Sequence, residues 1–431
     1  MERTKRNSRF WMALVIFSLV GQVAWVVENM YLNVFIYKMF AASANQISLM
    51  GGASSVAATV TTLLIGALSD KLGKRKIFIC GGYICWGISI LAFGLIREDW
   101  ISSIVPATVS AASVGISAVI ILDCLMTFFG SAANDASFNA WLTDSTDSTN
   151  RGAAEGLNAM MPLVAILAVF GGFMGLDQSL PESWTKIFFI IGGVVFVLGI
   201  LGFFLIDEPK VDTSENGSFL KNLVYGFRPS VIRENPRLYL TLMAYAVFGI
   251  SINIFMPYLI LYYEKSLGMA NYVFVFAPAI LLAAVFTAIY GRIYDKKGFS
   301  ASVLPSLGLL MAGYVLLYFF RGGAAVFIGT VLMLCGYLSG MAVFGAMIRD
   351  NTPENKSGMF QGQRILCQVL IPGIIGPAVG AAVLKNAETI IDSDGREVFL
   401  PNANIFLAAL CVAVILGIAL IPLLKNLKKG K

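Results

Sequence analysis

The chain has 431 residues, of which 58% are hydrophobic and 13% charged, and its formal net charge is +6. A soluble domain is typically about 45–50% apolar and about 25% charged, so this chain carries more apolar surface than a soluble fold can bury. The composition excludes an ordinary soluble enzyme, a disordered protein and a secreted disulfide scaffold, and it indicates a protein embedded in lipid.

The first apolar stretch follows a short basic N-terminus, and eleven more come after it. A membrane-spanning helix needs about 20 mostly apolar residues, and each of these stretches is long enough. They predict an all-α integral membrane protein with twelve transmembrane helices, at residues 11–37, 46–69, 77–96, 116–143, 152–175, 186–206, 237–262, 271–291, 300–320, 324–348, 358–384 and 403–424.

Residues 97–122 are ambiguous, because a polar loop there is followed by a further apolar run. Either an outer segment packs on the bundle, or the fourth helix is overlong. A thirteenth span would reverse the side of the membrane on which every later loop lies.

The outer stretch 385–402 is polar, and its Asp394-Gly395 pair indicates a turn.

Lysine and arginine are unevenly distributed over the predicted loops. With residues 1–10 placed in the cytoplasm, 24 of the 31 fall on the inside and 7 on the outside, as the positive-inside rule requires. A thirteenth span would break this agreement. We therefore expect a multi-pass protein of the cell membrane (plasma or inner), anchored by its first span, with both termini cytoplasmic. The positive charge is then that of cytoplasmic loops, so the lipid bilayer is an expected partner and nucleic acid is not.

The sequence has no histidine, which removes the side chain most often used as a general base or metal ligand. Its six cysteines lie in apolar runs and are interpreted as small buried hydrophobic residues. HExxH, GxSxG and the phosphate-binding GxxxxGK(S/T) pattern are absent from the sequence. We expect no enzymatic activity, no metal and no cofactor.

Two short patterns recur in the two halves of the chain. Glycine, aspartate, lysine and glycine at positions 66, 70, 71 and 73 recur at positions 291, 295, 296 and 298, and the pattern Asp-x-Thr-x5-Gly-x3-Gly begins at both Asp144 and Asp350. These turns follow equivalent predicted spans, so they predict two parallel six-helix halves, 1–206 and 237–431, joined by a cytoplasmic linker at 207–236. Bundles built from such repeats place the substrate near the midplane between the halves.

With this organisation the sequence resembles the major facilitator superfamily along nearly its whole length. The most specific element is Gly66-x3-Asp70-Lys71-x-Gly73-Lys74-Arg75-Lys76, which is similar to the family's signature in the loop between helices 2 and 3. The resemblance implies two pseudo-symmetric six-helix bundles and a gate that latches the cytoplasmic side closed; a plain basic anchor is the alternative. The residues assigned to this gate are Asp70, Gly73, Arg75, Asp144, Arg151, Asp295 and Asp350, with Gly73 supplying the tight turn.

A narrower resemblance is to the glycoside–pentoside–hexuronide cation symporters and the related sucrose-type carriers. It rests on Asn134-Asp135-x5-Trp141-Leu-Thr143-Asp144-x6-Arg151, a polar, acid-bearing fourth helix that leads into an acidic loop ending in arginine. Those symporters often carry acids in the second helix that help to bind sodium, whereas residues 60–66 contain none here. The resemblance implies sugar–cation symport, with the proton favoured over sodium as the coupling ion.

Three acidic residues lie well inside predicted spans, where ionisable groups are costly and are functional candidates. At about 1.5 Å per helical residue, Asp135 lies roughly 13 Å from the loop, near the midplane. Glu28 falls in the outer half of the first span, and Asp123 near the outer face. A carboxylate in a dry site can take up a proton on one side and release it on the other, so we expect Asp135, and then Glu28, to couple transport. A structural hydrogen bond is the alternative for both, and an outer-interface role is favoured for Asp123.

Amide and aromatic side chains inside the spans suit a neutral ligand rich in hydroxyls, because amides both donate and accept hydrogen bonds. Taken singly, each is better explained as a link between helices or an interface residue. Arg364, the one basic residue near a span interior, is expected to contact an anionic substrate group or to pair with Asp350. The candidate substrate-binding residues are Trp25, Asn29, Asn134, Asn139, Asn158, Asn253, Gln361 and Arg364.

The sequence thus predicts a secondary active transporter. Its expected partners are a small neutral solute, a sugar or glycoside, and a coupling ion, the proton more than sodium, carried together by alternating access. The alternative is a proton-coupled exporter of drugs or amphipathic metabolites, for which a largely apolar cavity would be better suited.

Overall fold

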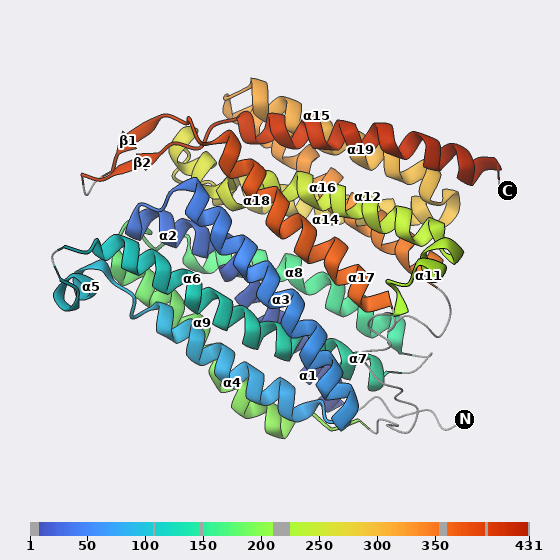
Figure 1. Cartoon of the computed structure of the whole chain (residues 1–431), viewed down its shortest axis with the longest axis horizontal. Helices are drawn as coiled ribbons and strands as arrows, with labels where there is room; N and C mark the ends of the chain where they lie inside the picture. Colours follow the sequence, from blue (N-terminus) through green and yellow to red (C-terminus); the bar gives the residue numbers. More distant parts are fainter. Residues whose placement is uncertain are drawn as a thin grey trace. The chain divides into compact units, whose positions relative to one another are not determined.

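The computed structural model describes residues 8–106, 108–146, 150–209, 225–352, 360–392 and 395–429, and the side chains in these ranges except at 361, 422, 423 and 425–429. These ranges are helical apart from loops and one short hairpin (Figure 1). Twelve helical segments are long and apolar enough to cross a membrane, which confirms the predicted number. The protein is therefore an all-helical, multi-pass membrane protein.

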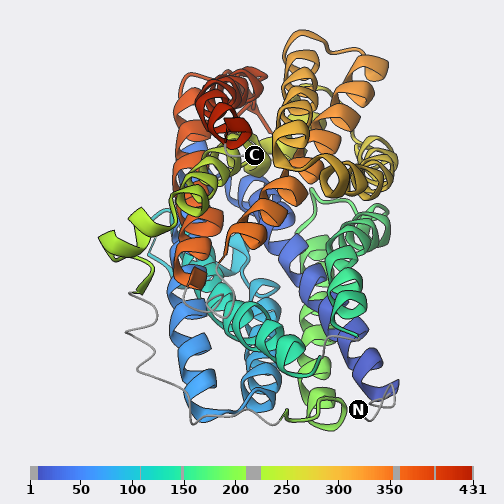
Figure 2. The same cartoon turned by 90° about the vertical axis from the view of Figure 1, so that its right-hand side faces the viewer.

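The chain divides into two compact units, residues 1–42 with 53–219 and residues 43–52 with 220–431. Within each unit the helices lie side by side in both views (Figure 2). Half of the predicted linker 207–236 lies outside the described residues, namely 210–224, and the boundaries 206 and 237 stay predictions.

The helices up to Leu205 make up the first six spans. They are α1 (Ser8–Val26), η1 (Val27–Tyr31), α2 (Leu32–Phe40), α3 (Ala44–Leu72), α4 (Lys76–Phe93), α5 (Glu98–Ile104), α6 (Ala111–Gly130), η2 (Ser131–Phe138), α7 (Asn139–Asp144), α8 (Arg151–Phe173) and α9 (Pro181–Leu205).

The remaining elements make up the last six spans and the hairpin. They are α11 (Pro229–Glu234), α12 (Pro236–Phe255), η3 (Met256–Tyr258), α13 (Leu259–Leu261), η4 (Tyr262–Ser266), α14 (Val273–Lys297), α15 (Phe299–Phe319), α16 (Gly323–Asn351), α17 (Gln361–Ile365), η6 (Leu366–Leu370), α18 (Ile371–Val383), β1 (Thr389–Ile391), β2 (Glu397–Phe399) and α19 (Asn404–Lys429).

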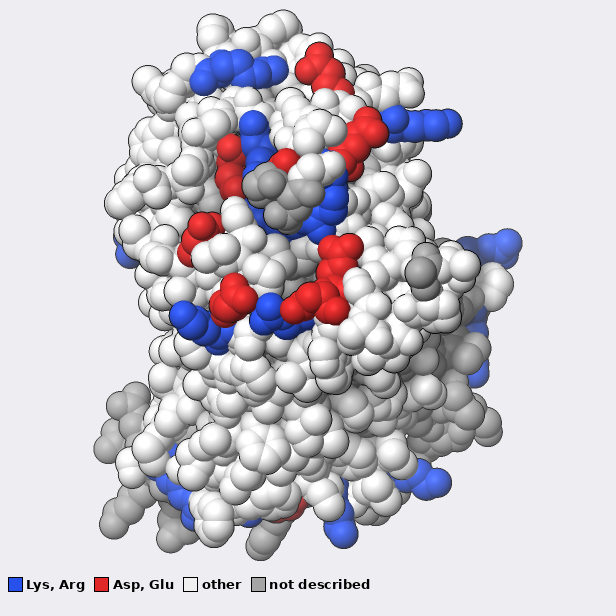
Figure 3. Space-filling model, turned by 90° about the vertical axis from the view of Figure 1, so that its left-hand side faces the viewer, with Lys and Arg blue, Asp and Glu red and all other residues white. Residues whose placement is uncertain are grey.

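The ambiguous region 97–122 contains features of both alternatives. A short helix, α5, is followed by a fourth span that runs over 34 residues, from Ala111 to Asp144. At the end of the molecule where α5 lies, acidic and basic side chains gather next to one another (Figure 3). Arg97 bonds there to Asp99 and to Glu182, at 3.1 and 3.3 Å, and the bond to Arg97 lowers the pKa of Asp99.

The predicted turn in the outer stretch 385–402 closes an antiparallel hairpin. β1 pairs with β2 so that Ile390 faces Val398, and Arg396 bonds to Asp392 across the turn at 3.1 Å. Gly395 has a φ of 76°, a left-handed value that favours glycine, while Asp394 lies outside the described residues.

In the described part of the chain, four spans contain a π-helical segment, namely η1, η2, η4 and η6. In a π segment the hydrogen bonds run from residue i to i+5, which widens the helix, and such segments frequently occur at functional sites. In η2 the hydroxyl of Ser137 donates to the carbonyl of Ala132, five residues earlier, over 2.7 Å. Two of the three buried acids that the sequence singled out, Glu28 and Asp135, lie in these segments.

Aromatic rings pack α1 against α4 in the core of the first unit. Ring centroids lie 5.0 Å apart for Phe17 and Tyr83, and 5.1 Å apart for Trp25 and Trp86. The Tyr83 hydroxyl also donates to the carbonyl of Phe17 over 2.9 Å, so a polar group within this core has its partner.

In the second unit, α15 and α16 approach so closely that a glycine is required at their contact. A Cβ added at Gly336 would lie 2.3 Å from the backbone nitrogen of Leu310. Small residues allow such approach between membrane helices, where packing replaces the hydrophobic effect as the force that holds helices together.

We expect Gly336→Ala to destabilise the protein by about 1–3 kcal/mol, because a backbone atom cannot move aside as a side chain can. The matched control is Gly345→Ala in the same helix, where an added Cβ would meet nothing within 4 Å. Thermal unfolding of the two purified variants measures the difference. Equal midpoints for the two would show that the α15–α16 contact is looser than the structure describes.

Candidate functional site

Asp135 lies in η2, within the fourth span, and its side chain is half-buried. Ser131 donates a hydrogen bond to its carboxylate over 3.0 Å. Among the described residues, no lysine or arginine forms an ion pair with Asp135. A carboxylate in a span without a cationic partner is suited to binding a proton.

Glu28 is the centre of a buried polar cluster in the same unit. The hydroxyls of Ser54, on α3, and Thr127, on α6, both donate to one of its carboxylate oxygens, over 2.9 and 2.8 Å. The two hydroxyl oxygens are themselves 2.8 Å apart. Glu28 is 7% exposed, and its position in η1 directs it towards these two helices.

Asp123 belongs to this cluster and does not lie at an outer interface, the role favoured from sequence. Its side chain is 2% exposed and lies near Ser54 and the carboxylate of Glu28. Counting residues gave its depth along the helix but not the face from which it projects. Asp123 is one turn before Thr127, so both project from the same face of α6.

The candidate amides differ in the partners they bond to. Asn29, Asn139 and Asn253 each donate to the carbonyl four residues earlier in their own helix, over 2.8, 3.0 and 2.9 Å, so these bonds do not link helices. Asn158 does link two helices, because it accepts a hydrogen bond from Ser18. Asn134 is buried and lies against Gly21.

The candidate residues on α17 belong to the second unit. Arg364 has a buried Nε without a hydrogen-bond partner in the part of the chain that the structure describes, and no ion pair there joins it to Asp350. Asp350 instead accepts a hydrogen bond from the Tyr294 hydroxyl over 2.5 Å. The expected Arg364–Asp350 pair is therefore wrong for this structure, and the side chain of Gln361 lies outside the described ones.

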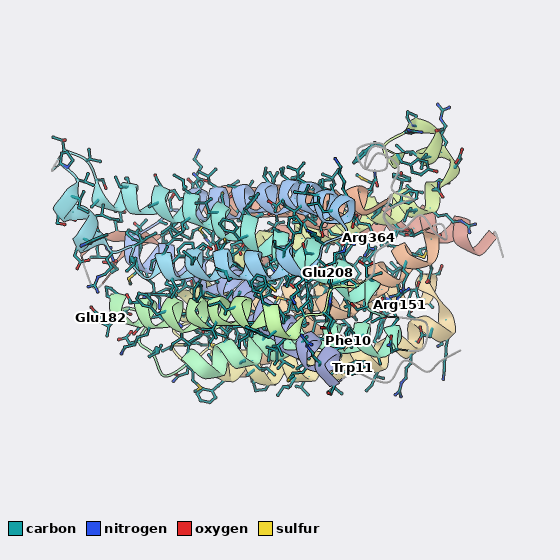
Figure 4. All side chains as sticks on the ribbon, turned by 90° about the horizontal axis from the view of Figure 1, so that it is seen from below. Phe10, Trp11, Arg151, Glu182, Glu208 and Arg364 are labelled. Carbon is teal, nitrogen blue, oxygen red and sulfur yellow. The ribbon has the colours of Figure 1, made fainter. Side chains whose placement is uncertain are left out.

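Arg75 joins several helix ends of the first unit at the end predicted to be cytoplasmic. Its side chain is 5% exposed, and it contacts Asp70 at 2.6 Å and Asp144 at 2.9 Å. It also donates to the Ser69 hydroxyl over 2.8 Å, and Glu208 accepts from its backbone N–H. The ends of α3, α4 and α7 and the segment after α9 are thereby tied together, at the opposite end from Glu182 (Figure 4).

The turn between α3 and α4 depends on Gly73, which has a φ of 63°, and the repeated glycine of the second unit, Gly298, has a φ of 72°. Both are left-handed values that favour glycine. The second unit does not repeat the cluster of contacts around Arg75. The position equivalent to Arg75 is Ser300, and Asp295 is exposed.

Arg151 caps the C-terminal end of α7 and forms no ion pair with an acid in the ranges that the structure describes. Its guanidinium donates to the carbonyls of Thr143 and Thr146, over 3.2 Å each. The last carbonyls of a helix have no partner inside the helix, and basic side chains often bond to them.

Several residues of these clusters were missed from sequence: Ser54, Thr127, Ser69 and Glu208. Hydroxyl residues are common in membrane spans and carry no charge, so only their position opposite a carboxylate reveals them. A signal did exist for Thr127, because it stands four residues after Asp123 and thus on the same helical face.

Comparison with protein-family models gives a match to the Major Facilitator Superfamily over residues 10–377. Comparison with curated proteins gives no match. Among solved structures, the chain is similar to the nucleoside transporter NupG, with a TM-score of 0.72 and 12% identity over 96% of this chain and 99% of that one.

Two further structures are similar over most of their length. A D-xylose–proton symporter gives a TM-score of 0.72 at 14% identity, covering 95% of this chain and 97% of that one. A bacterial homologue of the human lysosomal transporter Spinster, in its inward-facing and occupied conformation, gives 0.67 at 16% identity, covering 96% and 95%. At these identities the likeness shows the fold alone.

Proposed function

The chain belongs to the Major Facilitator Superfamily and is a secondary transporter, and from this premise we propose that it moves a small neutral solute, a sugar or glycoside, by proton symport through alternating access. The closer relation to the glycoside–pentoside–hexuronide and sucrose-type symporters is part of the same proposal.

The observation that carries the proposal is the presence of two exposed amide side chains inside two spans of the first unit. Asn29 is exposed and bonds to the carbonyl of Trp25, and Asn139 is exposed and bonds to the carbonyl of Asp135. Polar side chains inside a span face a protein interior or a water-filled space and not lipid. An aromatic ring and an acid, each with an amide beside it, offer stacking and hydrogen bonds to a hydroxyl-rich ligand.

Asp135 supplies the coupling in this proposal. It is half-buried, accepts one hydrogen bond and has no ion-pair partner among the described residues. A neutral ligand carries no charge. The proton bound to the carboxylate of Asp135 is therefore the charge that an inward proton gradient drives across the membrane. With no cationic partner in the described ranges, protonation and release of Asp135 follow solvent access from either side.

The gate is the second part of the proposal. The Arg75 cluster is interpreted as a cytoplasmic latch whose bonds fix the ends of α3, α4 and α7. The positive-inside distribution of lysine and arginine supports this orientation, with both termini in the cytoplasm.

The test is uptake into proteoliposomes with an imposed pH gradient, using a panel of radiolabelled mono- and disaccharides and glycosides. We expect one of them to accumulate when the gradient is inward and to equilibrate when a protonophore collapses it. Accumulation of no sugar under a proton or a sodium gradient would overturn the sugar proposal. Extrusion of an amphipathic cation by the same vesicles would favour the exporter.

A further inference from the structure

Glu28 and Asp123 form a pair of carboxylates buried in the first unit, 7% and 2% exposed. Ser54 donates a hydrogen bond to Glu28 over 2.9 Å and lies near Asp123. Thr127 completes the cluster, because its hydroxyl donates to Glu28 over 2.8 Å and its oxygen lies 2.8 Å from that of Ser54. Three separate helical segments therefore bring four oxygen-bearing side chains to one place.

Two oxygen atoms of this cluster lack a hydrogen-bond partner in the described structure. Oε2 of Glu28 and Oδ1 of Asp123 are buried and have no hydrogen-bond partner among the residues that the structure describes. Buried polar atoms in native structures are satisfied in about nine cases in ten, so two in one cluster indicate a missing partner. Both atoms belong to carboxylates and can therefore accept a proton or bind a cation.

The cluster also lacks a compensating positive charge. In the described ranges no lysine or arginine forms an ion pair with Glu28 or Asp123. The other titratable groups that act on the pair are Asp135 and Cys124, neither of which is cationic. Two like charges in a dry interior are strongly unfavourable, so something positive must bind there.

We propose that Glu28 and Asp123, with the hydroxyls of Ser54 and Thr127, form a site for one exchangeable monovalent cation, a proton or Na⁺, separate from Asp135. Its role in coupling rests on the proposed function, whereas the binding itself does not. Oxygen ligands suit a hard cation. The described residues hold no group of three or more His, Cys, Asp or Glu placed to bind a metal. When one of the two carboxylates keeps a proton, the pair carries one negative charge, which a single monovalent cation neutralises.

The test measures cation binding on the purified full-length protein, without any solute. Thermal unfolding is followed from mildly acidic to mildly alkaline pH, with sodium chloride or choline chloride at equal ionic strength. Binding to the folded state raises the unfolding midpoint with ligand concentration. A rise with Na⁺ but not choline identifies sodium, and a rise towards acidic pH, together with an infrared carboxylic-acid band that disappears on alkalinisation, identifies the proton.

The variants are compared in an Asp135→Asn background, because Asp135 is itself proposed to bind a proton. In this background we expect Glu28→Gln and Asp123→Asn each to abolish the dependence, because each removes a charged ligand. Ser54→Ala keeps both acids and is expected to weaken binding by about tenfold, the effect of losing one hydrogen bond to a charged group. This milder variant tests the site should an acid variant fail to fold, and the exposed control Glu155→Gln is expected to leave the dependence in place.

Retention of the wild-type dependence in Glu28→Gln, Asp123→Asn and Ser54→Ala, or no stabilisation of the wild type by either cation, would overturn the site. The two proposals fail separately. Cation binding without accumulation of any solute contradicts the proposed function alone. Proton-driven uptake that is lost in Asp135→Asn and unchanged in the cluster variants contradicts only the role of this cation site in coupling.

Discussion

Proteoliposomes that contain Asp135→Asn are expected to exchange solute across the membrane but not to accumulate it under an inward proton gradient. The substitution keeps the size and polarity of the side chain and removes the group that takes up the proton. Asparagine still accepts from Ser131, whose hydroxyl lies 3.0 Å from the carboxylate, so the segment η2 should keep its shape.

The size of this effect follows from the gradient. One pH unit supplies about 1.4 kcal/mol per proton, so a carrier that moves one proton per solute accumulates the solute about tenfold in wild type and not at all in the variant. Glu155→Gln, an exposed position on α8, serves as the control and should accumulate as wild type does. Accumulation by Asp135→Asn at the wild-type level would move the coupling to Glu28 and Asp123.

Arg75→Met is expected to lower both the stability and the transport rate more than any other substitution at the predicted cytoplasmic end. It removes the bonds to Asp70 and Asp144 at 2.6 and 2.9 Å and leaves the Ser69 hydroxyl without this partner. Breaking a fully buried pair costs about 3–5 kcal/mol, and the cost here should be smaller because the acids are partly exposed. Thermal unfolding and initial uptake rates measure the two effects.

Lys71→Met is the matched control, because Lys71 is exposed and belongs to the same basic motif. A latch requires the effect to be specific to Arg75, whereas a plain basic anchor predicts equal effects from the two residues. Arg75→Lys should be intermediate, since lysine keeps the charge but not the planar fork that reaches two acids at once. Equal stability and uptake for Arg75→Met and Lys71→Met would refute the latch.

The sequence by itself determined the class of the protein, the twelve spans, and the repeated turns at Gly73 and Gly298. These properties are local: lipid requires about 20 apolar residues in each helix, and a left-handed turn requires glycine. The acidic residues inside spans were found for the same reason, because a charge in an apolar run is visible without any knowledge of packing.

Only the tertiary structure decided which side chains meet. Asp123 joined Glu28 through Ser54, and Arg151 capped α7, because the face from which a helical residue projects depends on rotation and on neighbouring helices. The π-helical segments that position Glu28 and Asp135 shift this rotation further, and no spacing rule in the sequence revealed them. Contacts between helices that are distant in the chain depend on how the helices pack. The spacing of residues within one helix does not reveal this packing.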